Sequence, residues 1–110
     1  MNDAILIGSD GLGSPDQKLG EILLGNFLRI LGDRETLPKY IILWHGGVKT
    51  AARGSDTLGF LQTLEQRGVE IVICRTCVEF YGIEDEIAVG KVDGMVRMLD
   101  IMGSNSVLTV

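Results

Sequence analysis

Residues 3–32 read DAILIGSDGLGSPDQKLGEILLGNFLRILG, and this stretch indicates the architecture of the whole chain. The apolar run at 3–8 is too short for a helix and ends in a glycine-rich turn, which is typical of a strand buried on both faces of a sheet. Ser14 as N-cap and Pro15 at the first helical position predict that a helix begins directly after this turn. Apolar residues recur at three- and four-residue steps until Gly32 ends the helix. The expected core stripe consists of Leu19, Ile22, Leu23, Phe27, Ile30 and Leu31, widened by Leu24 and Leu28.

The same succession of strand, turn and helix repeats along the rest of the chain. Further strands are predicted at 39–45, 69–74, 87–89 and 106–110, and helices at 55–67, 78–81 and 93–102. In the last helix, Met95, Val96, Leu99 and Met102 are expected on one face, and Asp93 is the expected N-cap. Buried strands that alternate with amphipathic helices about every 30 residues are typical of a parallel sheet with helices on both faces. We therefore expect one α/β domain over residues 1–110, with three layers, α/β/α, and a mainly parallel sheet of about five strands.

Composition excludes several classes of function. The 110 residues include 10 Lys+Arg against 15 Asp+Glu, a formal net charge of -5, and no basic run. Nucleic acid and anionic membrane surfaces are therefore not expected partners, because both require clustered positive charge. No apolar stretch approaches the ~20 residues of a membrane span, and the N-terminus has no secretory pattern. A cytoplasmic protein is expected.

The ends of the predicted strands carry most of the reactive side chains. In a parallel sheet, ligands and chemistry collect at the carboxyl ends of the strands. The loops at these ends supply Ser9, Asp10 and Gly11 from the first strand, His45, Gly46 and Gly47 from the second, and Cys74, Arg75 and Cys77 from the third. We expect the three loops to converge on one edge of the sheet.

The motif Cys74-Arg75-Thr76-Cys77 contains both cysteines of the chain. A permanent disulfide is not expected in a reducing compartment. Cys77 follows the strand, and a helical first turn and the nearby Arg75 would lower its thiol pKa and make it nucleophilic. Cys74 is either reactive or a small core residue. His45 is a candidate base, metal ligand or thiolate partner, or it is satisfied by a backbone group.

Two other kinds of site receive little support from the motifs. The first loop has the glycines of a phosphate cradle but not the P-loop or dinucleotide patterns, which favours a structural turn. Zinc usually takes four Cys or His ligands in structural sites, and this chain has three such residues. No metal and no cofactor are expected.

Residues 72–83, VICRTCVEFYGI, resemble the DsrE/DsrF-like sulfur-relay proteins, and most closely the DsrE-like C-terminal domain of YedF-type proteins linked to selenium metabolism. The similarity extends over nearly the whole chain, including the LIGSD motif at 6–10 and the GGVK turn at 46–49. The resemblance implies that Cys74, eight residues before Gly82, carries sulfur as a persulfide. Cys77 matches the second cysteine of the YedF-like branch. The resemblance further implies a homo-oligomer, a dimer or trimer, with sulfur donor and acceptor proteins, such as a TusA-like carrier, supplied in trans.

The resulting hypothesis is a sulfurtransferase-like carrier in which a thiolate at Cys74 or Cys77 takes up a sulfane sulfur and passes it to an acceptor thiol. Arg75 and helix-end N–H groups would stabilise the anion, and His45 would orient it. Two alternatives remain. In the first, the glycine loops hold a small ligand or serve assembly, and the cysteines are core residues. In the second, the two cysteines form a dithiol redox or metal-binding pair.

Overall fold

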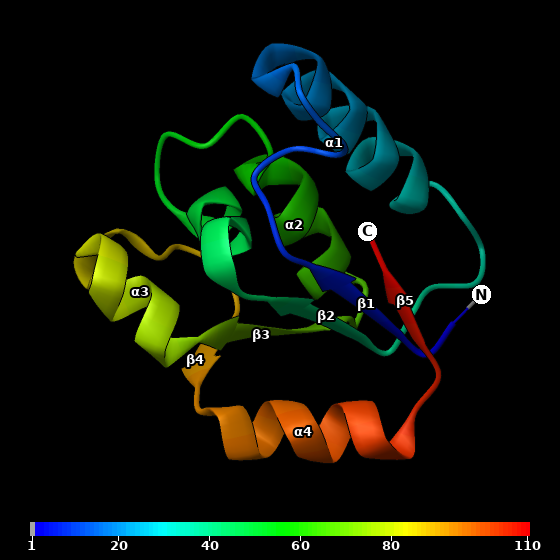
Figure 1. Cartoon of the computed structure of the whole chain (residues 1–110). Coiled ribbons are helices and arrows are strands. Elements are labelled where there is room, and N and C mark those ends of the chain that lie inside the picture. Colours follow the sequence, from blue (N-terminus) through cyan, green and yellow to red (C-terminus); the bar gives the residue numbers. More distant parts are fainter. Residues whose placement is uncertain (1) are drawn as a thin grey trace.

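The computed structural model describes residues 2–110, which form a parallel five-stranded sheet between two layers of helices (Figure 1). The strands are β1 (Ala4–Ile7), β2 (Tyr40–Leu43), β3 (Glu70–Cys74), β4 (Lys91–Asp93) and β5 (Val107–Thr109). The helices are α1 (Gln17–Leu31), α2 (Leu58–Gln66), α3 (Arg75–Tyr81) and α4 (Met95–Ser104), with 3-10 helices η1 (His45–Ala51) and η2 (Glu84–Glu86). Figure 1 shows α1 and α2 on one side of the sheet and α4 on the other. The predicted α/β/α architecture is confirmed.

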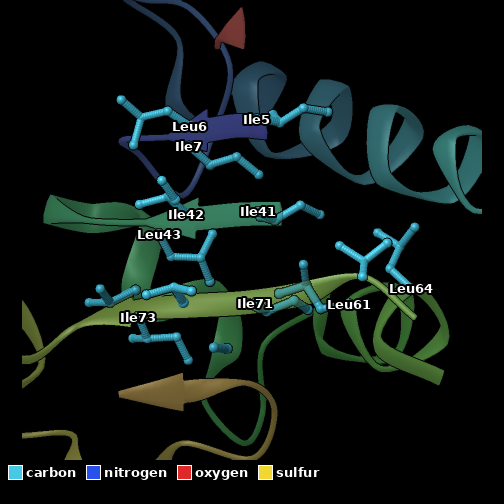
Figure 2. Close-up of a cluster of buried hydrophobic side chains, with 14 of the residues drawn as sticks. Ile5, Leu6, Ile7, Ile41, Ile42, Leu43, Leu61, Leu64, Ile71 and Ile73 are labelled. Atoms are coloured by element: carbon cyan, nitrogen blue, oxygen red, sulfur yellow. The ribbon is translucent and has the colours of Figure 1, made fainter. Parts of the chain in front are cut away.

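The sheet has the strand order β4-β3-β2-β1-β5, and every pairing is parallel. Its central strands are buried on both faces, as their continuous apolar runs predict. The register places Ile5 opposite Ile41, and Ile41 opposite Ile71. Figure 2 shows these side chains in the core with Leu61 and Leu64 of α2 beside them. No helix within the described residues is long and apolar enough to cross a membrane.

Helix α1 begins two residues later than predicted. Its N-cap is Asp16, whose carboxylate Oδ1 accepts a hydrogen bond from the backbone N–H of Leu19 at 3.1 Å. Ser14 and Pro15, the predicted cap and first helical residue, belong to the exposed turn before the helix. Aspartate is at least as good an N-cap as serine, and its position here satisfies a free N–H of the first turn.

The predicted core stripe of α1 is confirmed for Leu24, Leu28 and Leu31 and is wrong for four of its other members. The buried positions are Gly20, Leu24, Leu28 and Leu31, whereas Leu19, Ile22, Leu23 and Ile30 are 43–54% exposed. Gly20 decides the orientation: a methyl group there would lie 2.9 Å from the Leu12 carbonyl oxygen, and its own carbonyl accepts from the Leu12 N–H. The helix therefore packs Gly20 against the loop, and its other apolar face is exposed at the surface.

The fourth strand lies at 91–93 and not at 87–89, where only an isolated antiparallel bridge joins Ile87 to Ala52. Gly90 has φ of +75°, and a methyl group there would lie 2.7 Å from the Ile71 carbonyl oxygen. The chain therefore enters the sheet only after this glycine, through a turn that other residues adopt at a cost.

Other element boundaries also differ from those predicted. The second predicted helix begins at Leu58, after the turn that contains Ser55 and Asp56. The strand predicted to reach His45 ends at Leu43, and α3 begins immediately after β3 instead of at residue 78. In α4, Gly94 and not Asp93 is the N-cap, because Asp93 is still paired in β4. The predicted core face of α4 is corrected in the same way as that of α1: Met98 and Ile101 are buried, Met102 is half-buried, and Met95, Val96 and Leu99 are exposed.

Candidate functional site

The two cysteines lie at the carboxyl edge of the sheet, where β3 passes directly into α3. Cys74 is the last residue of the strand and the N-cap position of the helix, and it is 3% exposed. Cys77 lies one turn into α3 and is half-buried. Both thiols are free. Cys77 is therefore the thiol that a molecule in solution can reach.

His45 contributes to this site through its backbone. Its amide N–H donates a hydrogen bond to Sγ of Cys77, with a nitrogen–sulfur distance of 3.0 Å. His45 begins η1 with φ of +51°, a left-handed conformation that is uncommon for a residue other than glycine. Its imidazole is on the exposed surface. Of the roles considered for His45, the geometry favours that of a thiol partner, although the group involved is the amide.

Gly46 and Gly47 connect the second loop to the first. A methyl group at Gly47 would collide with the carbonyl oxygen of Ile7, at the end of β1. A methyl group at Gly46 would lie 3.7 Å from the backbone of Ser9 and Asp10. Because η1 contacts the first loop on one side and α3 on the other, the three predicted loops do converge at one edge.

The side chains of the first loop are engaged within the loop and with α1. Ser9 Oγ accepts a hydrogen bond from the Gly11 N–H at 3.3 Å, and Asp10 Oδ1 accepts from Nε2 of Gln17 at 3.0 Å. Gly11 lies against the backbone of Gly20, where a methyl group would be 3.0 Å from the Gly20 carbonyl carbon. These contacts are those of a structural turn that holds α1 onto the sheet.

Arg75 is exposed, and its guanidinium donates to the backbone carbonyl of Val92 in β4 at 3.3 Å. This contact ties α3 to the edge strand. The structure thus gives the Arg75 guanidinium a partner in β4, whereas the sequence suggested that it would stabilise the Cys77 thiolate.

The pKa of the Cys77 thiol is raised, in contrast to the lowered value that the sequence suggested. The first cause is burial, which disfavours the thiolate, and the second is the neighbouring Cys74 thiol. The His45 N–H acts in the opposite direction and lowers the pKa of Cys77, but it does not outweigh the other two effects. The amide is thus the group that favours the nucleophilic form of this cysteine.

The raised pKa makes the stability of the fold sensitive to alkaline pH. A thiol whose pKa is higher in the folded state contributes stability that is complete below its unfolded pKa of about 8.5 and is lost as the pH rises through the folded value. We expect the urea midpoint of the wild type to fall more steeply than that of Cys77→Ser above about pH 8.5, measured with a thiol reductant present. Parallel profiles for the two proteins would contradict a raised pKa at Cys77.

An aromatic group beside the thiols was not singled out from the sequence. Lys49 Nζ lies 4.4 Å from the centroid of the Tyr81 ring, and Phe80 packs edge-to-face on Tyr81 with centroids 5.3 Å apart. Phe80 is 83% exposed, although it is large and apolar. The three-residue spacing of Cys77 and Phe80 could have indicated this aromatic group in the sequence, because residues so spaced share one face of a helix.

Of the two thiols, Cys77 is accessible from the surface and Cys74 is buried. A hollow of about 200 Å³ lies between the first loop and the start of α2, lined by Asp10, Lys49 and Ser55 among others, and contains neither cysteine. A hollow of about 970 Å³ lies at the far end of α1, lined by Phe27 and Arg34 among others. Within residues 2–110 no three His, Cys, Asp or Glu side chains are grouped so that they could hold a metal ion.

Together, the parallel sheet and the two thiols at its carboxyl edge define an α/β/α protein with one accessible and one buried thiol at the end of β3. No protein-family model matches the chain, and no curated protein matches it significantly.

Solved structures show that this fold is shared by other proteins. The ychN protein of Escherichia coli is similar over 100% of both chains, with a TM-score of 0.70 and 18% identity. Protein BT1422 of Bacteroides thetaiotaomicron, of unknown function, is similar over 98% of this chain and 95% of its own, with a TM-score of 0.68 and 21% identity. Protein MTH1491 of Methanobacterium thermoautotrophicum, also of unknown function, covers 97% and 96%, with a TM-score of 0.68 and 18% identity. At these identities the comparison establishes the fold.

Proposed function

We propose that this protein is a cytoplasmic sulfurtransferase-like carrier, related to the DsrE-like domain of YedF-type proteins, that holds sulfur as a cysteine persulfide. The observation that carries the proposal is the 3.0 Å hydrogen bond from the His45 amide to Sγ of Cys77. A backbone N–H directed at sulfur favours the thiolate, which is the nucleophilic form of cysteine. The resemblance of residues 72–83 to sulfur-relay proteins supplies the reaction class.

The transfer is redox-neutral and takes place in two displacements. The cysteine loses its proton to solvent, and the thiolate attacks the sulfane sulfur of a donor. The S–S bond of the donor breaks, and the donor leaves with its electron pair. An acceptor thiolate then attacks the outer sulfur of the persulfide, and the cysteine leaves as a thiolate.

We assign to Cys77 the attack on the sulfur donor, although the resemblance to the sulfur-relay family favours Cys74. Cys77 is the accessible thiol and has the amide donor, whereas Cys74 is 3% exposed. Cys74 is three residues before Cys77 at the junction of β3 and α3 and contributes to the raised pKa of Cys77, which supports a role for Cys74 in discharging the persulfide. In that branch its thiolate attacks the inner sulfur of Cys77, a disulfide forms, hydrosulfide leaves, and a dithiol reductant must restore both thiols.

Protein partners fit the site better than a free small substrate. Cys77 is accessible from the surface, and Phe80 of the same helix is 83% exposed, so a donor or acceptor protein, such as a TusA-like carrier, can reach this thiol. Self-association is supported by the apolar side chains that α1 and α4 expose, since such surfaces usually mark contacts with other chains. We therefore include a homo-oligomer, a dimer or trimer, in the proposal.

A dithiol redox function is the second candidate, favoured by the proximity of Cys74 to Cys77. The two functions differ in the product that forms. A redox pair cycles between dithiol and disulfide with oxidants and reductants, and it retains no added sulfur.

The test is intact-mass measurement of the reduced protein after incubation with thiosulfate or a polysulfide and removal of excess donor. We expect an adduct of about 32 Da, one sulfur atom, that a thiol reductant removes. Because discharge by Cys74 also ends in a disulfide, the same measurement is made on Cys74→Ser, which cannot form it; a loss of about 2 Da in the wild type with no adduct in Cys74→Ser would identify the redox pair instead. An unchanged mass with every donor would contradict both functions.

A further inference from the structure

Residue 45 combines a strained backbone with a contact to the reactive thiol. His45 has φ of +51°, in the left-handed region, and it is the one non-glycine residue with a positive φ among residues 2–110. Its neighbours on the C-terminal side are Gly46 and Gly47, and neither of them has the positive φ that glycine tolerates best. The chain thus places the left-handed conformation on the residue whose N–H meets Cys77.

The imidazole of His45 does not account for this conformation. The side chain is exposed, while the amide lies against α3. Trp44 before it is in an extended conformation, with φ of −137° and ψ of 173°. The sharp change from extended to left-handed backbone is therefore the step that begins η1 and turns the amide towards α3.

We propose that His45 is a positioning residue that acts through its main chain: its left-handed backbone directs one amide N–H onto Sγ of Cys77, and its imidazole takes no part. The proposal rests on the proposed function in one respect: the stabilised thiolate serves sulfur transfer only if the protein is a sulfur carrier. Its physical content, that a backbone donor sets the reactivity of Cys77, is independent of any sulfur donor.

Ionisable groups also lie on α3 and on the elements packed against it. They are Glu70 and Cys74 of β3, His45 and Lys49 of η1, Lys91 and Asp93 of β4, and Arg75, Glu79 and Tyr81 of α3 itself. Glu70 is at the far end of β3, where it pairs with Arg97. Lys49 is engaged by the Tyr81 ring, and Arg75 by the Val92 carbonyl. Burial is the first cause of the raised pKa of Cys77; among the neighbouring groups, Cys74 shifts this pKa upward and the His45 amide shifts it downward.

The decisive experiment removes the N–H and leaves the side chain in place. In a Cys74→Ser background, position 45 is replaced by the α-hydroxy acid counterpart of histidine, so that an ester oxygen stands where the N–H was. We expect the rate of Cys77 alkylation by iodoacetamide near neutral pH to fall about tenfold, with its pH profile displaced upward by about one unit. His45→Gly and His45→Asn, which retain the N–H and tolerate a positive φ, should remain within about twofold of the parent.

Two outcomes overturn the proposal. An ester variant with an unchanged pH profile would show that the N–H does not act on the thiol. An equal loss in His45→Gly would show that the imidazole acts instead. If the ester variant does not fold, the amide proton of ¹⁵N-labelled His45 decides the question in the parent protein. Its chemical shift must titrate with the midpoint of Cys77 alkylation, and a flat shift overturns the proposal.

These measurements are separate from the test of the proposed function. Alkylation and amide titration need no sulfur donor, so they can succeed with a protein that forms no persulfide. Conversely, a persulfide that forms equally well in the ester variant would leave the carrier function intact and remove the role of His45.

Discussion

Cys77→Ser should form no persulfide adduct with a sulfane-sulfur donor, whereas Cys74→Ser should form it and retain it longer than the wild type. The asymmetry follows from the structure, because Cys77 is accessible and accepts the His45 N–H, while Cys74 is 3% exposed. Loss of the nucleophile removes the covalent step altogether, so the adduct should fall below detection. Loss of Cys74 removes the internal thiol that discharges the persulfide as a disulfide. Intact mass as a function of time measures both effects.

Thr76→Ser provides a matched control, because Thr76 is exposed on the same turn of α3 and carries no thiol. It should load and discharge sulfur like the wild type. The opposite result for the cysteines, with the adduct lost in Cys74→Ser and kept in Cys77→Ser, would place the carrier at the position that family resemblance implies. It would also require α3 to move before Cys74 could meet a donor.

Gly47→Ala should be the most destabilising of the single-methyl changes considered for this site. The added methyl group would collide with the Ile7 carbonyl oxygen and lie 3.0 Å from the Ile7 carbonyl carbon, and both atoms belong to a central strand that cannot give way. Overpacking of this kind costs about 3 kcal/mol at the upper end of its usual range, and more when backbone atoms collide. Urea unfolding followed by circular dichroism measures the loss. Because η1 must also move, alkylation of Cys77 should change in the same variant.

Gly25→Ala is the control for glycine replacement in general. Gly25 lies in the interior of α1, and nothing is within 4 Å of a methyl group at that position. There, alanine should stabilise the protein by about 0.5–1 kcal/mol, because it restricts the unfolded chain and favours the helix. A Gly47→Ala protein as stable as the wild type would mean that η1 does not sit against β1 as described.

The class of fold could be predicted from the sequence because it depends on coarse patterns. Short apolar runs bounded by glycine, as at 3–8 and 69–74, can be buried on both faces only in a parallel sheet covered by helices. The convergence of the three loops follows from that topology. Neither inference needs the position of any single side chain.

The details that escaped prediction depend on backbone contacts between distant residues. The buried face of α1 is chosen by Gly20 against Leu12, and periodicity cannot rank two apolar faces of one helix. Strand β4 begins later in the sequence than predicted because Gly90 packs closely against the backbone of Ile71. At the site, the partner of Cys77 is the backbone N–H of His45, which every residue type except proline provides, so no sequence motif marks it.

The pairing of β5 with β1 has a consequence for how the chain folds. Ala4 is in register with Val107, so strand β1, near the start of the chain, pairs on one side with a segment about one hundred residues later. Contacts this far apart close late, because the entropy of the intervening loop is lost before the contact contributes. During synthesis, the edge of β1 that pairs with β5 therefore stays unpaired until β5 has left the ribosome. The pairing of β1 with β5 is then the last to form.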